Sequence, residues 1–121
     1  YIMGVKGGTI LLNQIVLVGR LVRKPELKEL ENGKKLSFIT LAVPRSFKNL
    51  AGEYETDFID CTLWDSVAIS TVDYCGKGDI VGVKGRIQSR VVEKPEGNRT
   101  QLDVIAEKVT FLSSKSKDVT P

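Results

Sequence analysis

Histidine is absent from this 121-residue sequence, and cysteine occurs only twice, as Cys61 and Cys75. Without histidine, the side chain that most often moves protons near neutral pH is missing, and Ser66 and Ser70 have no activating partner in the sequence. The two cysteines lack the spacing of a redox or zinc-binding pair, and a zinc site would need more ligands. We therefore expect no enzymatic activity, no metal and no cofactor, with both thiols buried.

Long apolar runs are missing too. No stretch approaches the roughly 20 residues that span a bilayer, and no charged-then-apolar leader is visible, so we expect a cytoplasmic protein. Neither sign of charge dominates, because 18 Lys and Arg are set against 15 Asp and Glu, a net charge of +3. This balance permits an anionic partner without requiring one, since the clustering of cations matters more than their sum.

The length of the chain and its hydrophobic content of 41% fit a single domain with a modest core. We expect the folded domain to comprise residues 12–112. Residues 1–11 are interpreted as an N-terminal extension or residual expression sequence, and residues 113–121 as a short polar tail.

Alternating apolar residues predict β-strands over most of the chain. Residues 15–21 and 36–43 carry apolar side chains on both faces, as central strands do. Three segments rich in Gly, Asn or Pro, at 31–34, 48–54 and 93–98, indicate turns between strands. The pattern predicts about five strands.

One segment, from Asp65 to Tyr74, changes to a helical period. Asp65 or Ser66 is the predicted N-cap, and Gly76 is placed to end the helix. Gly82 and Gly85, in the strand that follows, are interpreted as points where the strand bends. The predicted fold is therefore all-β, with one short helix between the third and fourth strands.

The stretch from Phe58 to Trp64 suggests a function. Side chains alternate between the two faces of a strand, so Phe58, Asp60, Thr62 and Trp64 share one face, and the face opposite is apolar. Two aromatic rings among small polar groups make a poor core but a plausible platform on which the bases of a single nucleic-acid strand could stack. The alternative is that both rings are ordinary half-buried strand residues.

Four motifs occur in a characteristic order: Asn-x-Ile-x-Leu-Val-Gly-Arg-Leu at 13–21, Pro-Glu-Leu at 25–27, Asp-Phe-Ile-x-Cys-x-x-Trp at 57–64 and Lys-Gly-Asp-x-x-x-Val-x-Gly-Arg-Ile at 77–87. Over residues 12–112 the sequence resembles the bacterial and phage single-stranded DNA-binding proteins. The resemblance implies an OB-fold, a five-stranded Greek-key barrel that binds oligonucleotides. It also implies a homotetramer that coats single-stranded DNA with little base preference during replication, recombination and repair, at the nucleoid.

The resemblance places base-stacking residues at Phe47, Phe58 and Trp64. Two positions where relatives often carry aromatics are Val92 and Thr100 here, and the family's acidic C-terminal tip has no counterpart after Leu112. The candidate phosphate contacts are cations, each of which taken alone could be no more than a solvated charge: Arg20, Arg45, Lys48, Lys77, Arg86, Arg90, Lys94 and Arg99. Lys77 and Arg90 rank highest, because they align with basic positions of the family.

Two other functions remain open. One is a primosomal replication-restart protein, a dimeric OB-fold relative, although Trp64 and the Lys77-Gly78-Asp79 motif favour the first interpretation. The other is an OB-fold adaptor that binds proteins and has lost affinity for DNA. The acids Asp60 and Asp65 near the platform, which would repel phosphate, give the adaptor some weight.

Overall fold

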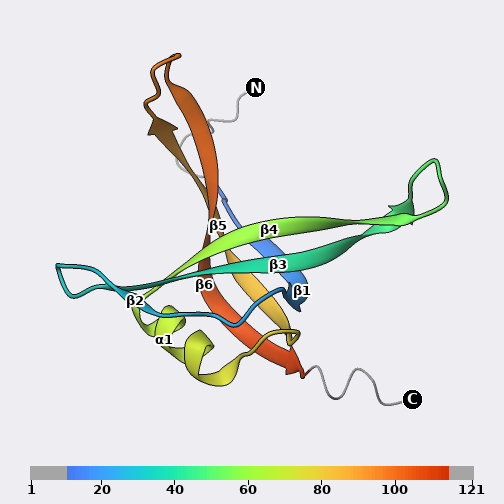
Figure 1. The fold of residues 1–121 in the computed structure, drawn as a ribbon, viewed down its shortest axis with the longest axis horizontal. Helices are drawn as coiled ribbons and strands as arrows, with labels where there is room; N and C mark the ends of the chain where they lie inside the picture. Colours follow the sequence, from blue (N-terminus) through green and yellow to red (C-terminus); the bar gives the residue numbers. More distant parts are fainter. Residues whose placement is uncertain (1–10, 115–121) are drawn as a thin grey trace.

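The computed structural model describes residues 11–114, so the expectations for residues 1–10 and 115–121 lie outside the described part. Figure 1 shows a twisted β structure with one helix at its side. The elements in chain order are β1 (Ile15–Leu21), β2 (Lys28–Glu29), β3 (Lys35–Lys48), β4 (Tyr54–Trp64), α1 (Asp65–Tyr74), β5 (Ile80–Val92) and β6 (Arg99–Ser113).

Five long strands close into a barrel. The strand order is β1-β5-β6-β4-β3, and β1 also pairs with β3, which joins the two edges. All pairs are antiparallel except β4 with β6, which run parallel. The two-residue β2 adds only to the edge of β3. The predicted five-stranded OB-fold barrel, with its helix after the third long strand, is confirmed.

The core is formed by the inward-facing side chains of these strands. Leu21, Ile39, Leu41, Leu63 and Val81 are among the fully buried residues, and α1 adds Ala68 at one side. Both cysteines are also buried, as expected. Burial, followed by the nearby charge of Asp60, raises the pKa of the Cys61 thiol to about 11.

The start of α1 differs from the prediction. Trp64 holds the N-cap position without a side-chain hydrogen bond, and Asp65 is the first helical residue, so neither Asp65 nor Ser66 is the N-cap. The Asp65 carboxylate instead accepts a hydrogen bond of 3.0 Å from the backbone N–H of Lys35, and Asp65 has a positive φ of 48°. A contact 30 residues away therefore determines how the chain turns from β4 into the helix. At the other end, Gly76 follows the C-cap residue Cys75.

Two hairpins extend beyond the barrel, and they position the site (Figure 1). One, the β3–β4 arm, comprises residues 43–57. The other, the β5–β6 arm, comprises residues 87–104 and leaves the barrel just beyond Gly85, where the β5–β6 register shifts. A Cβ atom at Gly85 would lie 2.0 Å from the Ile105 carbonyl oxygen, which explains why glycine occupies this bend.

Candidate nucleic-acid interface

The outer face of β4 carries the predicted platform. Ile59 is half-buried and Cys61 and Leu63 are buried on the core side, whereas Phe58 is 67% exposed and Trp64 is 37% exposed on the outer side. The alternation read from the sequence is therefore confirmed for this strand.

A third ring, Phe38, lies on the same outer face and was missed by the sequence analysis. In the β3–β4 register Phe38 is opposite Thr62, and Trp64 is opposite Leu36, so Phe38 and Trp64 are diagonal neighbours. Diagonal neighbours on one face of an antiparallel pair are within reach of each other when the side chains are aromatic. Phe38 is 46% exposed. The signal was present in the alternation of residues 36–42, but it required the register with β4.

A groove of about 430 Å³ runs between this outer face and the base of the β5–β6 arm. One wall carries Phe38, Phe58 and Asp60, and the other carries Arg90 and residues 101–104. An aromatic wall facing a cation is the arrangement that a single nucleic-acid strand requires, because bases stack on rings and phosphates pair with cations. The sequence-predicted residues that the structure brings together here are Phe58 and Arg90.

Carboxylates moderate the charge of this groove. Arg90 donates a hydrogen bond from Nε to Asp103 at 2.6 Å, so the highest-ranked cation in the groove is partly neutralised. Asp60 lies between the two rings of β4 and accepts a hydrogen bond of 2.6 Å from the hydroxyl of Thr40. Both acids would oppose an incoming phosphate.

Two of the other predicted cations are paired elsewhere. Arg45 forms ion pairs with Asp57 at 2.9 Å and with Glu55 at 3.2 Å. The hydrogen bond between Arg45 and Asp57 raises the pKa of the guanidinium and lowers the pKa of the carboxyl group. Arg86 pairs with Glu107 at 2.9 Å. Neither Arg45 nor Arg86 is among the residues that line the groove.

The remaining predicted residues lie near the ends of the arms or at the far end of the barrel. Phe47 and Lys48 end β3 in the β3–β4 arm, where Lys48 Nζ is 5.6 Å from the centre of the Tyr54 ring. Lys94 and Arg99 lie at the turn of the β5–β6 arm. Lys77 lies in the turn after α1, and Arg20 donates a hydrogen bond to the neighbouring Gly78 carbonyl.

The two expected aromatic losses fall on opposite faces of the β5–β6 arm. Val92 pairs with Arg99 and Thr100 pairs with Val91, and adjacent pairs point to opposite sides. By the same alternation, Val92 shares a face with Arg90. An aromatic residue at position 92 would therefore extend the wall that Arg90 lines, whereas one at position 100 would not.

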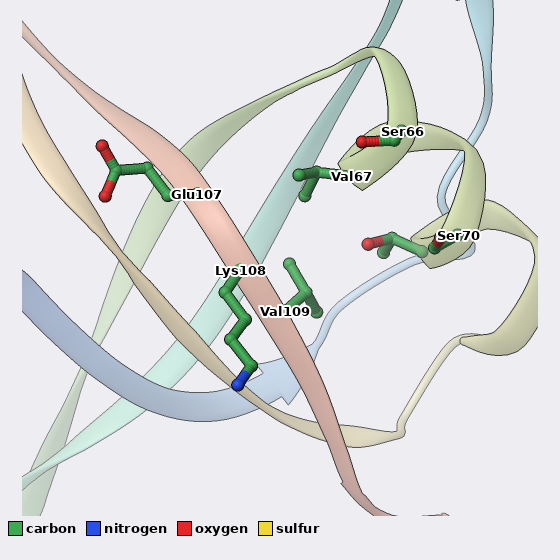
Figure 2. Close-up of a pocket in the computed structure, with 7 residues that line it drawn as sticks. Ser66, Val67, Ser70, Glu107, Lys108 and Val109 are labelled. Carbon is green, nitrogen blue, oxygen red and sulfur yellow. The ribbon is translucent and has the colours of Figure 1, made fainter.

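A second hollow, of about 210 Å³, lies between α1 and β6 (Figure 2). Ser66 and Ser70 line it from the helix, and Glu107 and Lys108 line it from the strand. In Figure 2 the Lys108 ammonium points away from both serines, and Glu107 is engaged with Arg86. Neither Glu107 nor Lys108 is therefore placed to activate a serine across this hollow.

Within residues 11–114, no group of three or more Cys, Asp or Glu side chains could hold a metal ion. The same part of the chain contains no helix that is both long and apolar enough to cross a membrane.

Comparisons with known proteins show which family the chain resembles. Residues 12–112 match the model of the Single-strand binding protein family. The chain is similar to Single-stranded DNA-binding protein B of Bacillus subtilis, with 46% identity over 109 residues that cover 89% of this chain and 96% of the relative. It is also similar to the single-stranded DNA-binding protein of Halalkalibacterium halodurans, with 46% identity over 106 residues, 87% of this chain and 63% of the relative.

A solved structure is similar as well. A deletion mutant of the single-stranded DNA binding protein from Thermus aquaticus superposes with a TM-score of 0.72 at 25% identity, over 87% of this chain and 52% of that chain. The chain thus spans nearly the full length of one relative and less than two thirds of others.

Proposed function

The chain belongs to the Single-strand binding protein family, and from this premise we propose how it binds single-stranded DNA. Bases stack on the outer face of β3 and β4, and cations of the two arms contact the phosphates. The observation that carries the proposal is the groove in which the exposed Phe58 ring faces Arg90. Stacking uses the π face common to every base, so the protein coats DNA with little sequence preference.

Within this proposal, Phe58 and Trp64 stack bases at the centre of the path, and Phe47 stacks a base on the β3–β4 arm. Arg90 contacts phosphate in the groove. The predicted cations nearer the turns of the arms, Lys48, Lys94 and Arg99, extend the path on either side. Lys77 and Arg20 would contact a strand that continues to the far end of the barrel, and Arg45 and Arg86 would have to leave their carboxylates first.

We also propose that the protein acts in the cytoplasm at the nucleoid, without catalytic turnover, during replication, recombination and repair. A homotetramer would let several platforms share one strand, so that avidity compensates for modest individual sites. Val16 and Val18 support this assembly, because both are exposed apolar side chains on the outer side of β1.

A competition titration tests the proposed function. The protein should bind oligothymidine much more tightly than a duplex of matched length, because a duplex hides the faces of its bases. Affinity should fall as salt rises, since bound counterions are released. Equal affinity for duplex would contradict stacking, and no binding to either would favour the protein-binding adaptor. Native mass with oligothymidines of increasing length reports the oligomeric state in the same experiment.

A further inference from the structure

Phe38 lines two grooves at once. On one side it forms part of the wall that it shares with Phe58. On the other side it borders a second groove, of about 190 Å³, whose remaining lining residues come from the segment after β1 and from the first residue of β2. These residues are Arg23, Lys24, Glu26 and Lys28. The ring therefore separates the platform from a groove with three cations and one carboxylate.

The segment that supplies the cations is held against β3 on both sides of Phe38. The backbone N–H of Val22 donates to the Thr40 carbonyl at 3.1 Å, and Lys28 pairs with Leu36. Between these points Pro25 is fully buried and anchors the segment. Arg23 and Lys24 are exposed, and no carboxylate among the described residues forms an ion pair with either of them or with Lys28. A fixed backbone thus presents three cations that are available to an anion.

Lys28 forms a cation–π contact with Phe38, because its Nζ lies 5.6 Å from the centre of the ring. A cation over an exposed ring is held weakly, so a base can displace it. An ammonium displaced from the ring would still be close enough to pair with a phosphate of the same strand. Phe38 and Lys28 could therefore bind the base and the phosphate of a single nucleotide.

From these contacts we propose that Phe38 is a further base-stacking residue and that the single strand continues over it into the groove of Arg23, Lys24 and Lys28, where its phosphates are bound. The proposal rests on the proposed function and extends the path beyond the platform. The distance between the Phe38 and Phe58 rings follows from the residue spacing along β3. Phe38 is four residues from Ala42, the cross-strand partner of Phe58, which places the two rings roughly 13 Å apart along the strand.

Variants of Phe38 test the stacking. Phe38→Ala should weaken binding of a short oligothymidine by roughly 5- to 150-fold, as for other stacked rings, and Phe38→Tyr should bind as the wild type does. Phe111→Ala is the matched control, since Phe111 is 44% exposed and lines a different hollow beside α1. Thermal melts of both alanine variants should show similarly small losses.

The cations are tested by the salt dependence of binding to a longer oligothymidine. The double variant Lys24→Gln with Lys28→Gln should lower the slope of log affinity against log salt by about 1.4, since each phosphate contact on a single strand contributes about 0.7. The control is Lys84→Gln with Lys108→Gln, a cross-strand pair of exposed lysines on β5 and β6.

Two results would overturn the inference. One is a Phe38→Ala variant that binds as tightly as Phe111→Ala, while Phe58→Ala binds weakly; the platform would then stand without Phe38. The other is a salt slope for the Lys24 and Lys28 variant that equals the control. If Phe58→Ala also binds as the wild type does, the proposed DNA path itself fails, and the two failures are thereby distinguished.

Discussion

The guanidinium of Arg90 lies 2.6 Å from the carboxylate of Asp103, across the two strands of the β5–β6 arm. Both side chains line the groove that contains Phe58. A phosphate that binds Arg90 must therefore compete with a carboxylate that is already in place. The affinity of this groove for DNA therefore depends on how strongly Asp103 holds Arg90 in competition with a phosphate.

Replacing Asp103 by Asn should tighten binding of oligothymidine. The change releases Arg90 and removes a negative charge, and an exposed ion pair of this kind is worth up to about 1 kcal/mol. Titrations at low and high salt check the prediction, with the larger gain expected at low salt. Asp73→Asn, on the exposed side of α1, controls for the change in net charge. Weaker binding by Asp103→Asn would mean that the pair orients Arg90 for the phosphate.

Asp60→Asn should also tighten binding, for a different reason. Asp60 is fixed between the rings of β4 by the hydroxyl of Thr40, and an asparagine oxygen can accept the same hydrogen bond. The fold should therefore be unchanged, while a repulsion on the order of 1 kcal/mol disappears. Unchanged affinity at low salt would show that the DNA passes elsewhere on this face.

Asp65 should affect stability rather than binding. Asp65→Ala removes the acceptor of the Lys35 N–H and leaves a residue with a β-carbon at a positive φ. A loss of about 1–3 kcal/mol in the free energy of unfolding is expected. Asp65→Asn should lose much less, because asparagine tolerates this backbone conformation and keeps an acceptor. Denaturant titrations measure both, and equal losses in the two variants would contradict the role of the hydrogen bond.

Patterns local in sequence predicted the fold well. The alternation in residues 58–64 identified an inner and an outer face, and the helical period after Trp64 identified α1. What escaped prediction depends on pairings between distant segments. Phe38 is identified as part of the platform only when its pairing with Thr62 is known. The N-cap was assigned wrongly because the Asp65 carboxylate accepts a hydrogen bond from the backbone of Lys35.

The same limit applies to the candidate cations. Arg45 and Arg90 each face a carboxylate across a hairpin. Neither the number of cations nor the residues next to them in the sequence indicated this, because such pairs are determined by strand register and twist. The cations of residues 23–28 were overlooked for a related reason. Lys24 and Lys28 lie beside Phe38 only because Pro25 is buried and β2 pairs with β3, and neither fact can be read from the sequence.

Stability should fall at alkaline pH because of Cys61. Its thiol has a pKa of about 11 in the folded protein against an ordinary 9.0, chiefly through burial. The raised pKa means that the unfolded chain releases this proton first. The contribution is therefore fully present below pH 9 and is lost between about pH 9 and 11, by about 3 kcal/mol at most. In Cys61→Ala, denaturant titrations over this range should show a smaller decline, with Cys75 accounting for part of what remains. An identical decline would contradict the assignment to Cys61.

The fluorescence of Trp64 tests the central claim most directly. Trp64 is the only tryptophan in the sequence, so its emission reports from the outer face of β4 alone. If this face carries the DNA, oligothymidine should quench the emission to saturation. The midpoint should move to higher oligothymidine concentration in Phe58→Ala, by a loss of ~1–3 kcal/mol, and should stay in place in Tyr74→Ala, an exposed ring at the end of α1. Oligothymidine binding that is evident by anisotropy, but leaves Trp64 emission unchanged and is unaffected by Phe58→Ala, would contradict the claim.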